Sequence, residues 1–196
     1  MRYSTSTTDP LVTACQLHRL ADYMVADQDD PAIDIVARQA TAAVVEFLEC
    51  DLVSRNRVTV YQHWPHIGTY SGPSLSPQDA RLSHEIVLPF ANLEPDTSPT
   101  VTVFGEAFSD FEVLETNPAS VRIRPQHSTS DDPAIRIEYV SGFGPDVLDV
   151  PEHIRDGVIM LAAFMFEHRG ECDAQEALRR SGAASYLQPY SLRSLI

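Results

Sequence analysis

One stretch constrains the fold of this chain more than any other: DVPEHIRDGVIMLAAFMFEHRG, residues 149–170. Nine apolar residues, 158–166, follow one another there without a polar break. Pro151 and Glu152 are typical of the first turn of a helix, and Gly170 is a natural stop. Because a bilayer takes about 20 apolar residues to cross, this run is far too short to span a membrane. The stretch therefore predicts a soluble helix with apolar side chains on every side.

Such a helix must be packed against other elements on every side, and the sequence allows two ways of doing so. The other helices and the sheet of the same subunit can enclose it completely. Alternatively, one face is kept for a neighbouring subunit. The residues expected to pack in that way are Ile154, Val158, Leu161, Met165 and Phe166.

The charge balance excludes one broad class of function. The 196 residues suffice for one domain with a sizeable core. There are 28 acidic residues against 14 basic ones, a net charge of −14, and every basic residue is Arg. A protein that grips phosphate backbones needs clustered positive charge, so this balance argues against that role. It suits a surface that repels DNA or that meets a basic partner.

Cysteine usage and the N-terminus indicate the compartment. Cys15, Cys50 and Cys172 are odd in number and far apart, and no CxxC motif occurs. This pattern argues against a disulfide framework or a thiolate zinc site and favours a reducing compartment. Residues 1–10 are rich in Ser and Thr and lack the apolar core of a signal peptide, so we expect a flexible terminus. The expected location is the cytoplasm, or a particle assembled there.

Helical patterns lie at both ends of the chain. Four helices are predicted, at about 12–24, 31–49, 151–169 and 173–180. The second is the best marked, because Asp30 is a good N-cap and Pro31 suits the first helical position. Its apolar stripe contains Ile33, Val36, Ala37, Ala40, Val44, Phe47 and Leu48, and its polar face contains Asp34, Arg38, Thr41 and Glu49.

The middle of the chain changes to alternating, β-branched runs. Strands are predicted at RVTVYQHW, HEIVLPF, TVTVFGEAF, FEVLE, SVRIRP and AIRIEYVSG, and residues 65–80 are predicted to form a loop. The loops around ANLEPDTSP and QHSTSDDP are expected to project as hairpin or insertion tips. Helices at the ends with strands between them predict an α+β fold, with two N-terminal and two C-terminal helices in a small bundle. We expect one domain over 11–181 with a β-rich insertion at about 55–144, followed by an extended tail, 182–196.

A histidine pair is the one candidate metal site. HWPH places His63 and His66 three residues apart beside Trp64. A third ligand would have to come from Asp79, His84 or Glu85. However, His-x-x-His in a strand-to-loop passage is not the helical spacing that aims two imidazoles at one ion. We favour a buried Trp64 with histidines at its rim, and no metal or cofactor. A small metal-dependent hydrolase using His63 and His66 stays as an alternative.

Other patterns have a catalytic and a structural interpretation. GFGP at 142–145 lacks the third glycine of a nucleotide loop and fits a turn better. The Glu-His pairs at 152–153 and 167–168 have no identifiable nucleophile and suit the ends of a helix. The cysteines fall in or near helical patterns, where a small buried thiol is the ordinary case. We therefore predict no catalytic residues.

The ordered set of elements resembles the head–tail connector, or adaptor, proteins of long-tailed bacteriophages and of phage-derived gene transfer particles. LVTACQLHRLADYM and DDPAIDIVARQATAAVVEFLE match the two leading helices of that family. YQHWP, EIVLPFANLEP and RIEYVSGFG match its strands, DVPEHIRDGVIMLAAFMFEHRGE its most typical helix, and YLQPYSLRSL its closing segment. The likeness runs from about Leu11 to the C-terminus. The region 65–133 departs from it, with more loop than many relatives have.

The resemblance implies a structural protein and not an enzyme. It implies a homo-oligomeric ring of about twelve subunits docked under the portal protein of a virion or phage-like particle that is assembled in the bacterial cytoplasm. Such a ring extends the DNA channel and offers a platform for the stopper or tail-completion protein. DNA would pass without specific binding, because an acidic bore repels phosphate. Asp29, Asp30, Asp131 and Asp132 are candidates to line that bore, and solvated surface is the simpler alternative.

The closing segment is apolar and aromatic, with little to make it fold alone, which is typical of segments that fold on a partner. We hypothesise that it docks on the portal; the alternative is that it covers the chain's own helices. The residues expected to bind the portal are Tyr186, Leu187, Pro189, Tyr190, Leu192, Arg193, Leu195 and Ile196.

Two further functions stay open from the sequence. A stopper or tail-completion subunit belongs to the same assembly, but such subunits are mainly β and the predicted helices count against it. A DNA-binding regulator is disfavoured by the acidic charge and by the absence of a basic recognition helix.

Overall fold

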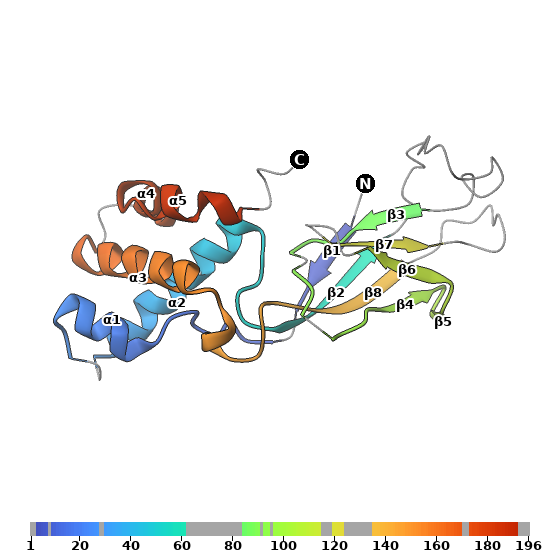
Figure 1. Cartoon of the computed structure of the whole chain (residues 1–196), viewed down its shortest axis with the longest axis horizontal. Helices are drawn as coiled ribbons and strands as arrows, with labels where there is room; N and C mark the ends of the chain where they lie inside the picture. The colour runs from blue at the N-terminus through green and yellow to red at the C-terminus, as the bar shows by residue number, and fades with distance from the viewer. Residues whose placement is uncertain are drawn as a thin grey trace. The chain divides into compact units, whose positions relative to one another are not determined.

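The computed structural model describes residues 3–7, 9–27, 30–61, 84–90, 92–94, 96–114, 119–123, 135–169 and 173–191. The chain forms two compact units (Figure 1). The sheet unit comprises residues 1–8 and 56–140, and the helical unit comprises residues 9–55 and 141–196. The combination of helices with antiparallel sheets confirms the α+β class. The chain passes between these two units three times.

Two sheets make up the sheet unit. The larger has the strand order β1-β2-β8-β4-β5, and the smaller has the order β3-β7-β6. The registered pairs β1–β2, β4–β5, β4–β8, β3–β7 and β6–β7 are all antiparallel. The strands are β1 Tyr3–Ser6, β2 Arg55–Tyr61, β3 His84–Val87, β4 Thr100–Val103, β5 Glu106–Phe108, β6 Phe111–Leu114, β7 Ser120–Ile123 and β8 Ile135–Ser141.

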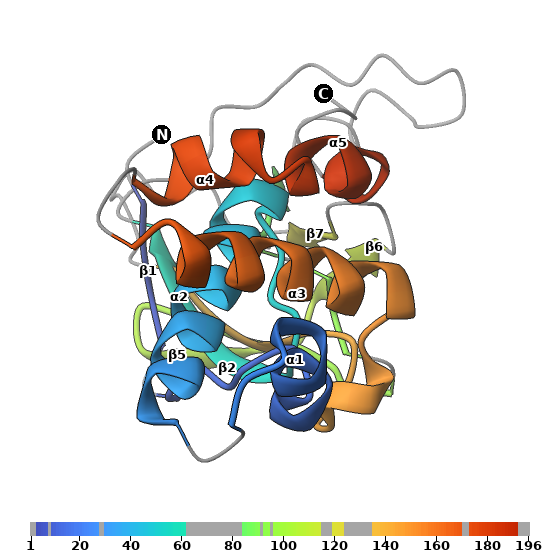
Figure 2. The same ribbon diagram turned by 90° about the vertical axis from the view of Figure 1, so that its left-hand side faces the viewer.

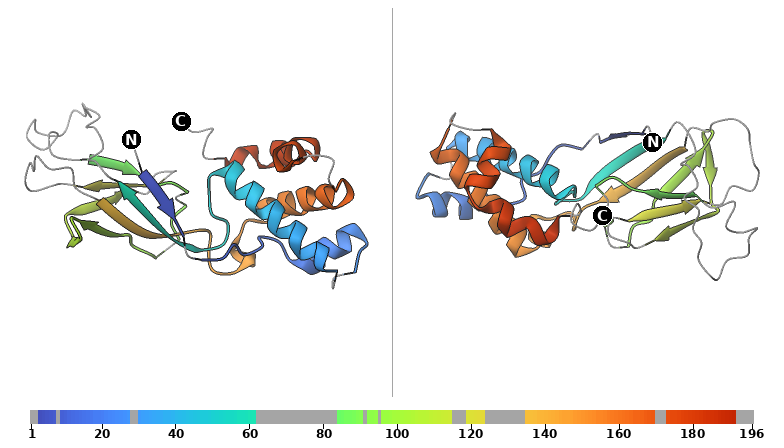
Figure 3. Two further views of the ribbon diagram at one scale, coloured as in Figure 1. Left: turned by 180° about the vertical axis from the view of Figure 1, so that it is seen from behind. Right: turned by 90° about the horizontal axis from the view of Figure 1, so that it is seen from above.

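Both sheets contribute to one apolar core, so they pack face to face (Figure 3). The smaller sheet supplies Ile86, Val121 and Ile123, and the larger supplies Val101, Ile135 and Ile137. Along β8, buried and exposed side chains alternate up to Tyr139, as expected for a strand with one face on a core. This period of two confirms the strand predicted from AIRIEYVSG.

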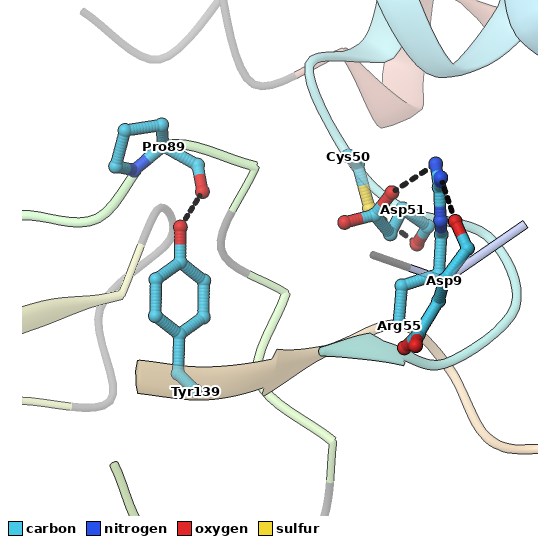
Figure 4. Close-up of polar contacts among 6 residues, drawn as sticks. All are labelled: Asp9, Cys50, Asp51, Arg55, Pro89 and Tyr139. Carbon is cyan, nitrogen blue, oxygen red and sulfur yellow. Dashed lines mark hydrogen bonds and ion pairs between the residues drawn. The ribbon is translucent and has the colours of Figure 1, made fainter. Parts of the chain in front are cut away.

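Two tyrosine hydroxyls fix the chain where β3 ends. Tyr61 of β2 donates a hydrogen bond to the carbonyl oxygen of Val87 at 3.0 Å. Tyr139 of β8 donates to the carbonyl oxygen of Pro89 (Figure 4). Leu88, between the two acceptors, is buried in the core. The leucine–proline step noted in the sequence is therefore held on both sides by the larger sheet.

Two expectations for the β segments were wrong. Residues 3–6, expected in a flexible terminus, form β1 because their backbone pairs with β2. The run TVTVFGEAF, expected as one strand, folds back as the β4–β5 hairpin. Its turn residues Phe104 and Gly105 have φ values of 55° and 82°, as the two central residues of a type I′ turn require. β2 ends at Tyr61, and HWPH and the loop 65–80 lie outside the described residues.

All five α-helices of the described residues belong to the helical unit (Figure 2). α3 contacts each of the other four, so the helices pack around it. The elements are α1 Leu17–Met24, α2 Pro31–Leu48, the 3₁₀ helix η1 Val147–Asp149, α3 Glu152–Glu167, α4 Ala174–Arg180, α5 Ala183–Leu187 and the 3₁₀ helix η2 Gln188–Tyr190.

The start of α2 is as predicted. Oδ1 of Asp30 accepts a hydrogen bond from the backbone N–H of Ala32 at 2.8 Å, and Pro31 occupies the first helical position. The other helix boundaries shift. α1 begins at Leu17 and not near residue 12. Pro151 precedes α3 as its N-cap, and α3 ends at Glu167. Gly170, expected as the stop, lies outside the described residues.

Thr41 was expected on the polar face of α2, but only 1% of its surface is exposed. Its hydroxyl donates to the carbonyl oxygen of Ala37 at 2.8 Å and accepts from the backbone N–H of Ala14 at 3.1 Å. These bonds satisfy the buried hydroxyl. They also tie residues 11–16, which are not helical, to α2, and this explains why α1 starts late.

A buried ion pair lies where the chain enters and leaves the helical unit. Asp51 is completely buried, and its Oδ1 lies 3.7 Å from Nη1 of Arg55, whose side chain is 13% exposed. Nη2 of Arg55 also donates to the carbonyl oxygen of Asp9 at 2.7 Å (Figure 4). One guanidinium therefore joins the segment that enters the unit at Asp9 to the segment that leaves it at Arg55.

The third segment that passes between the units, near residue 141, is hydrogen-bonded through its backbone to the residues just before Arg55. The N–H of Ser54 donates to the carbonyl oxygen of Gly144 at 2.9 Å. A Cβ atom on Gly142, whose φ is +143°, would lie 2.6 Å from the Cα atom of Ser54. Only glycine allows this approach, so the GFGP motif is a structural crossing point and not a nucleotide loop.

We expect Asp51→Asn to lower the free energy of unfolding by about 2–4 kcal/mol, because it leaves the guanidinium of Arg55 buried without its counter-charge. Urea denaturation measures the change. Asp34→Asn is the matched control, since Asp34 and Arg38 form an exposed pair with the same spacing. The control should cost less than about 1 kcal/mol. Equal losses in the two variants would contradict the role given to the buried pair.

Candidate functional site

α3 is covered mainly by its own unit. Ile154, Val158 and Leu161, three of the five residues expected to meet a neighbouring subunit, are completely buried. Met165 and Phe166, the other two, are half-buried near the C-terminal end of the helix. Of these five residues, only the two at this end keep surface for another molecule.

Aromatic rings and cations gather at that end of α3. The ring of His168 stacks on Phe164, with 4.1 Å between centroids, and the guanidinium of Arg169 lies 3.9 Å from the centroid of Phe166. Arg180 of α4 also lies over Phe164, at 5.3 Å. Neither Arg169 nor Arg180 forms an ion pair with a carboxylate of the described residues. These contacts are worth about 0.5–1 kcal/mol each at an exposed site and leave the N–H donors of the guanidinium available.

A groove runs beside this cluster, between the first half of α2 and the end of α3. Ile35 and Val36 line it from α2, Met165 lines it from α3, and His168 and Arg169 line it from the residues that follow α3. Ile35 is 55% exposed although it is a large aliphatic residue. The sequence pattern does not reveal this groove, because Ile35 lies outside the apolar stripe of α2 and only packing shows that Met165 faces it.

The C-terminal segment is folded as far as Ser191, which corrects the expectation of an extended tail from residue 182. Leu187 is completely buried, and a Cβ on Gly157 of α3 would lie 2.6 Å from its Cδ2. Nδ1 of His153 lies 2.9 Å from the hydroxyl oxygen of Tyr186. Oγ of Ser191 donates to the carbonyl oxygen of Phe47 at 3.4 Å. This part of the segment covers the chain's own helices.

The residues expected to bind the portal therefore fall into three groups. Leu187 is part of the core. Tyr186 and Tyr190, 39% and 38% exposed, and the exposed Pro189 remain on the surface. The last four lie outside the described residues: Leu192, Arg193, Leu195 and Ile196.

The structure gives no support to the hydrolase alternative. His63, His66 and Asp79 lie outside the described residues, and so does the side chain of His84. Glu85 accepts from Ser120 at 3.0 Å and lies 3.6 Å from Arg122, so it serves the pairing of β3 with β7. No group of three metal-binding side chains occurs among the described residues.

The cysteines of the helical unit behave as core residues. Cys15 and Cys50 are buried and form no disulfide with each other. Burial raises the pKa of the Cys15 thiol to about 11. At neutral pH the thiol is therefore protonated, which is the opposite of what a nucleophilic cysteine needs. Cys172 lies outside the described residues.

Of the four aspartates proposed to line a channel, one has a structural role and three lie outside the described residues. Asp30 caps α2, and Asp29, Asp131 and Asp132 lie outside the described residues. Glu152, on the first turn of α3, lies 4.0 Å from Arg19 of α1.

In the described part of the chain, no helix has the length and apolar character needed to span a membrane.

No protein-family model and no curated protein matches this chain. Solved structures do. A chain in the neck of an empty gene transfer agent (GTA) particle, computed with C6 symmetry, is 15% identical with a TM-score of 0.65, over 91% of this chain and 94% of that one. The neck of a native GTA particle, computed with C12 symmetry, gives 15% and 0.64 over the same shares. The virion of a native GTA particle gives 14% and 0.62 over 90% and 93%. At these identities the likeness shows a shared fold over nearly the whole of both chains.

The contact between Gly157 and Leu187 can be tested by a double-mutant cycle. We expect Leu187→Ala to cost about 2–4 kcal/mol by opening a cavity. Gly157→Ala should cost about 1–2 kcal/mol, because overpacking outweighs the gain in helix propensity. Together they should cost at least about 1 kcal/mol less than their sum, since the added methyl occupies the space that leucine vacates.

Thermal or urea unfolding of the four proteins measures the cycle. Leu88→Ala is the matched control, because Leu88 is buried to the same degree but lies in the sheet unit. Its effect should add to that of Gly157→Ala. If the Leu187 pair is also additive, the C-terminal segment does not lie on α3 as described.

Proposed function

We propose that this protein is a structural head–tail adaptor in the neck of a phage-like gene transfer particle. The observation that carries the proposal is the fold shared with chains of GTA necks over nine-tenths of the sequence. The order of helices and strands that resembles the connector family supports it independently. A described surface with apolar grooves and no cluster of metal ligands suits a protein that works by assembly rather than by catalysis.

In this role the protein forms a ring. A subunit that uses two different surfaces, one for each neighbour, generates a closed ring when the rotation between copies closes, here with about twelve copies. The GTA necks computed with C6 and C12 symmetry support rotational symmetry of this kind. The five described helices favour the adaptor over a stopper, which is mainly β.

The ring would continue the DNA channel from the portal protein towards the stopper or tail-completion protein. The net charge of −14 supports this part of the proposal. DNA must slide through such a channel, and carboxylates repel its phosphates, whereas clustered arginines would hold them. DNA therefore passes through the channel without binding specifically to the protein.

Portal binding is assigned to the end of the chain. The described residues leave Tyr186 and Tyr190 partly exposed on α5 and η2, next to the point where residues 192–196 continue. Aromatic side chains of this kind are common anchors in protein interfaces. We infer that the portal contacts these two tyrosines together with Leu192, Arg193, Leu195 and Ile196.

Deleting the gene in cells that produce the particle should yield DNA-filled heads and separate tails, because the joint is missing. Electron microscopy of the lysate measures the fraction of tailed particles. Expression of the intact protein from a plasmid should restore that fraction. Normal tailed particles without the protein would contradict the proposed function.

Removing residues 192–196 should leave the unfolding midpoint unchanged and weaken binding to the portal of the same particle by at least about tenfold, as loss of an interface anchor does. Circular dichroism and analytical ultracentrifugation of the mixture measure the two effects. Removal from Tyr186 onward is the contrasting variant, since it also deletes the buried Leu187 and should destabilise the fold. Portal binding that survives the shorter deletion would contradict the assignment.

A further inference from the structure

We propose that neighbouring copies of this chain join through two surfaces at opposite ends of α3. One is a corner that presents Leu148, formed by residues 144–149 before the helix. The other is the groove between α2 and α3 described above. The corner of one copy lies in the groove of the next. This inference rests on the proposed ring and names the contact that builds it.

The corner is rigid and exposes a leucine. Asp146 accepts from the backbone N–H of Leu148 at 2.8 Å, and Asp149 accepts from the backbone N–H of Asp146 at 2.9 Å. A Cβ on Gly144 would lie 2.5 Å from Oδ2 of Asp149, so the turn closes only with glycine there. Leu148 is nevertheless 59% exposed at the tip. A preorganised apolar tip loses little entropy on binding, which is what a docking residue requires.

The groove complements this tip in shape and polarity. Its walls offer the exposed Ile35 and the half-buried Met165, which are apolar partners for a leucine side chain. Its rim carries His168 and the guanidinium of Arg169. The guanidinium of Arg169 lies over the ring of Phe166 and has no carboxylate partner among the described residues.

The charges match as well. The corner carries the exposed carboxylates of Asp146 and Asp149, and Glu152 follows it on α3, 4.0 Å from Arg19 of the same chain; the groove ends at a cation. Such opposite potentials select the orientation of two partners. DNA is a poor alternative occupant, since an isolated arginine on a chain with a net charge of −14 cannot hold a phosphate backbone.

The two surfaces cannot meet within one copy. α3 has 16 residues, so its ends are separated by about 24 Å. Figure 2 shows α3 running across the helical unit, with α2 beside it. Because the corner and the groove are different patches at opposite ends of α3, their contact is heterologous. Such a contact builds a ring when the rotation between copies closes, whereas one patch facing itself would give only a dimer.

Cysteine cross-linking in assembled particles tests the contact. Leu148→Cys and Ile35→Cys are combined in a Cys172→Ser background, and purified particles are oxidised mildly. We expect the double variant to give a ladder of covalent oligomers larger than dimers on a non-reducing gel. Each single variant should remain monomeric. A dimer from Leu148→Cys alone would overturn the heterologous arrangement, and double-variant particles without a ladder would overturn the contact.

Charge reversal gives a second, independent readout. Arg169→Glu should lower the fraction of tailed particles about tenfold, and adding Glu152→Arg to the same chain should restore most of it. Arg136→Glu, the same change on an exposed arginine of the sheet unit, should leave the fraction unchanged. If Arg169→Glu behaves like this control, the groove is not an interface.

The two proposals fail in different ways. If the unmodified protein is absent from purified particles, the adaptor function falls and the subunit contact falls with it. If the protein is present and the cross-links and charge reversals have no effect, the adaptor function stands and the contact is wrong. Circular dichroism of each purified variant verifies beforehand that it is folded.

Discussion

The burial of α3 is the constraint on which the helical unit depends. A helix with nine successive apolar residues needs partners around most of its surface, and α1, α2, α4 and α5 all contact it. The short α5 can pack there only because Gly157 leaves room for Leu187. This arrangement explains why the chain returns after the sheet unit: helices from both ends of the sequence are needed to enclose a single one.

The covering is incomplete at one end of α3, and that is where the surface becomes suited to assembly. Met165 and Phe166 are half-buried, Ile35 is exposed beside them, and Arg169 lies on an aromatic ring without an acidic partner in the described structure. At the opposite end, a hydrogen-bonded corner holds Leu148 in water. Apolar side chains held rigidly on the surface cost solvation energy in an isolated subunit, and a neighbouring copy would remove that cost.

A few residues of the helical unit hold together the three segments through which the chain passes between its units. The guanidinium of Arg55 joins the carboxylate of Asp51 to the backbone of Asp9, and Gly142 brings the third passage against Ser54. A buried charged group is stable only when it is paired and hydrogen-bonded, so this site depends on all of its partners being present.

The sequence by itself determined the elements that local chemistry specifies. The cap at Asp30 and Pro31 marked α2, the alternation in AIRIEYVSG marked β8, and the apolar run marked α3, because periodicity and capping are properties of short segments. Only the tertiary structure decided which partner each face meets. It placed Thr41 inside, because Ala14 and Ala37 satisfy its hydroxyl, and it folded residues 183–190 onto α3, because Gly157 makes room for Leu187. It also formed the α2–α3 groove, whose residues lie more than 100 positions apart in the chain. Contacts over such separations leave no periodic signal, so they become visible only when the chain is folded.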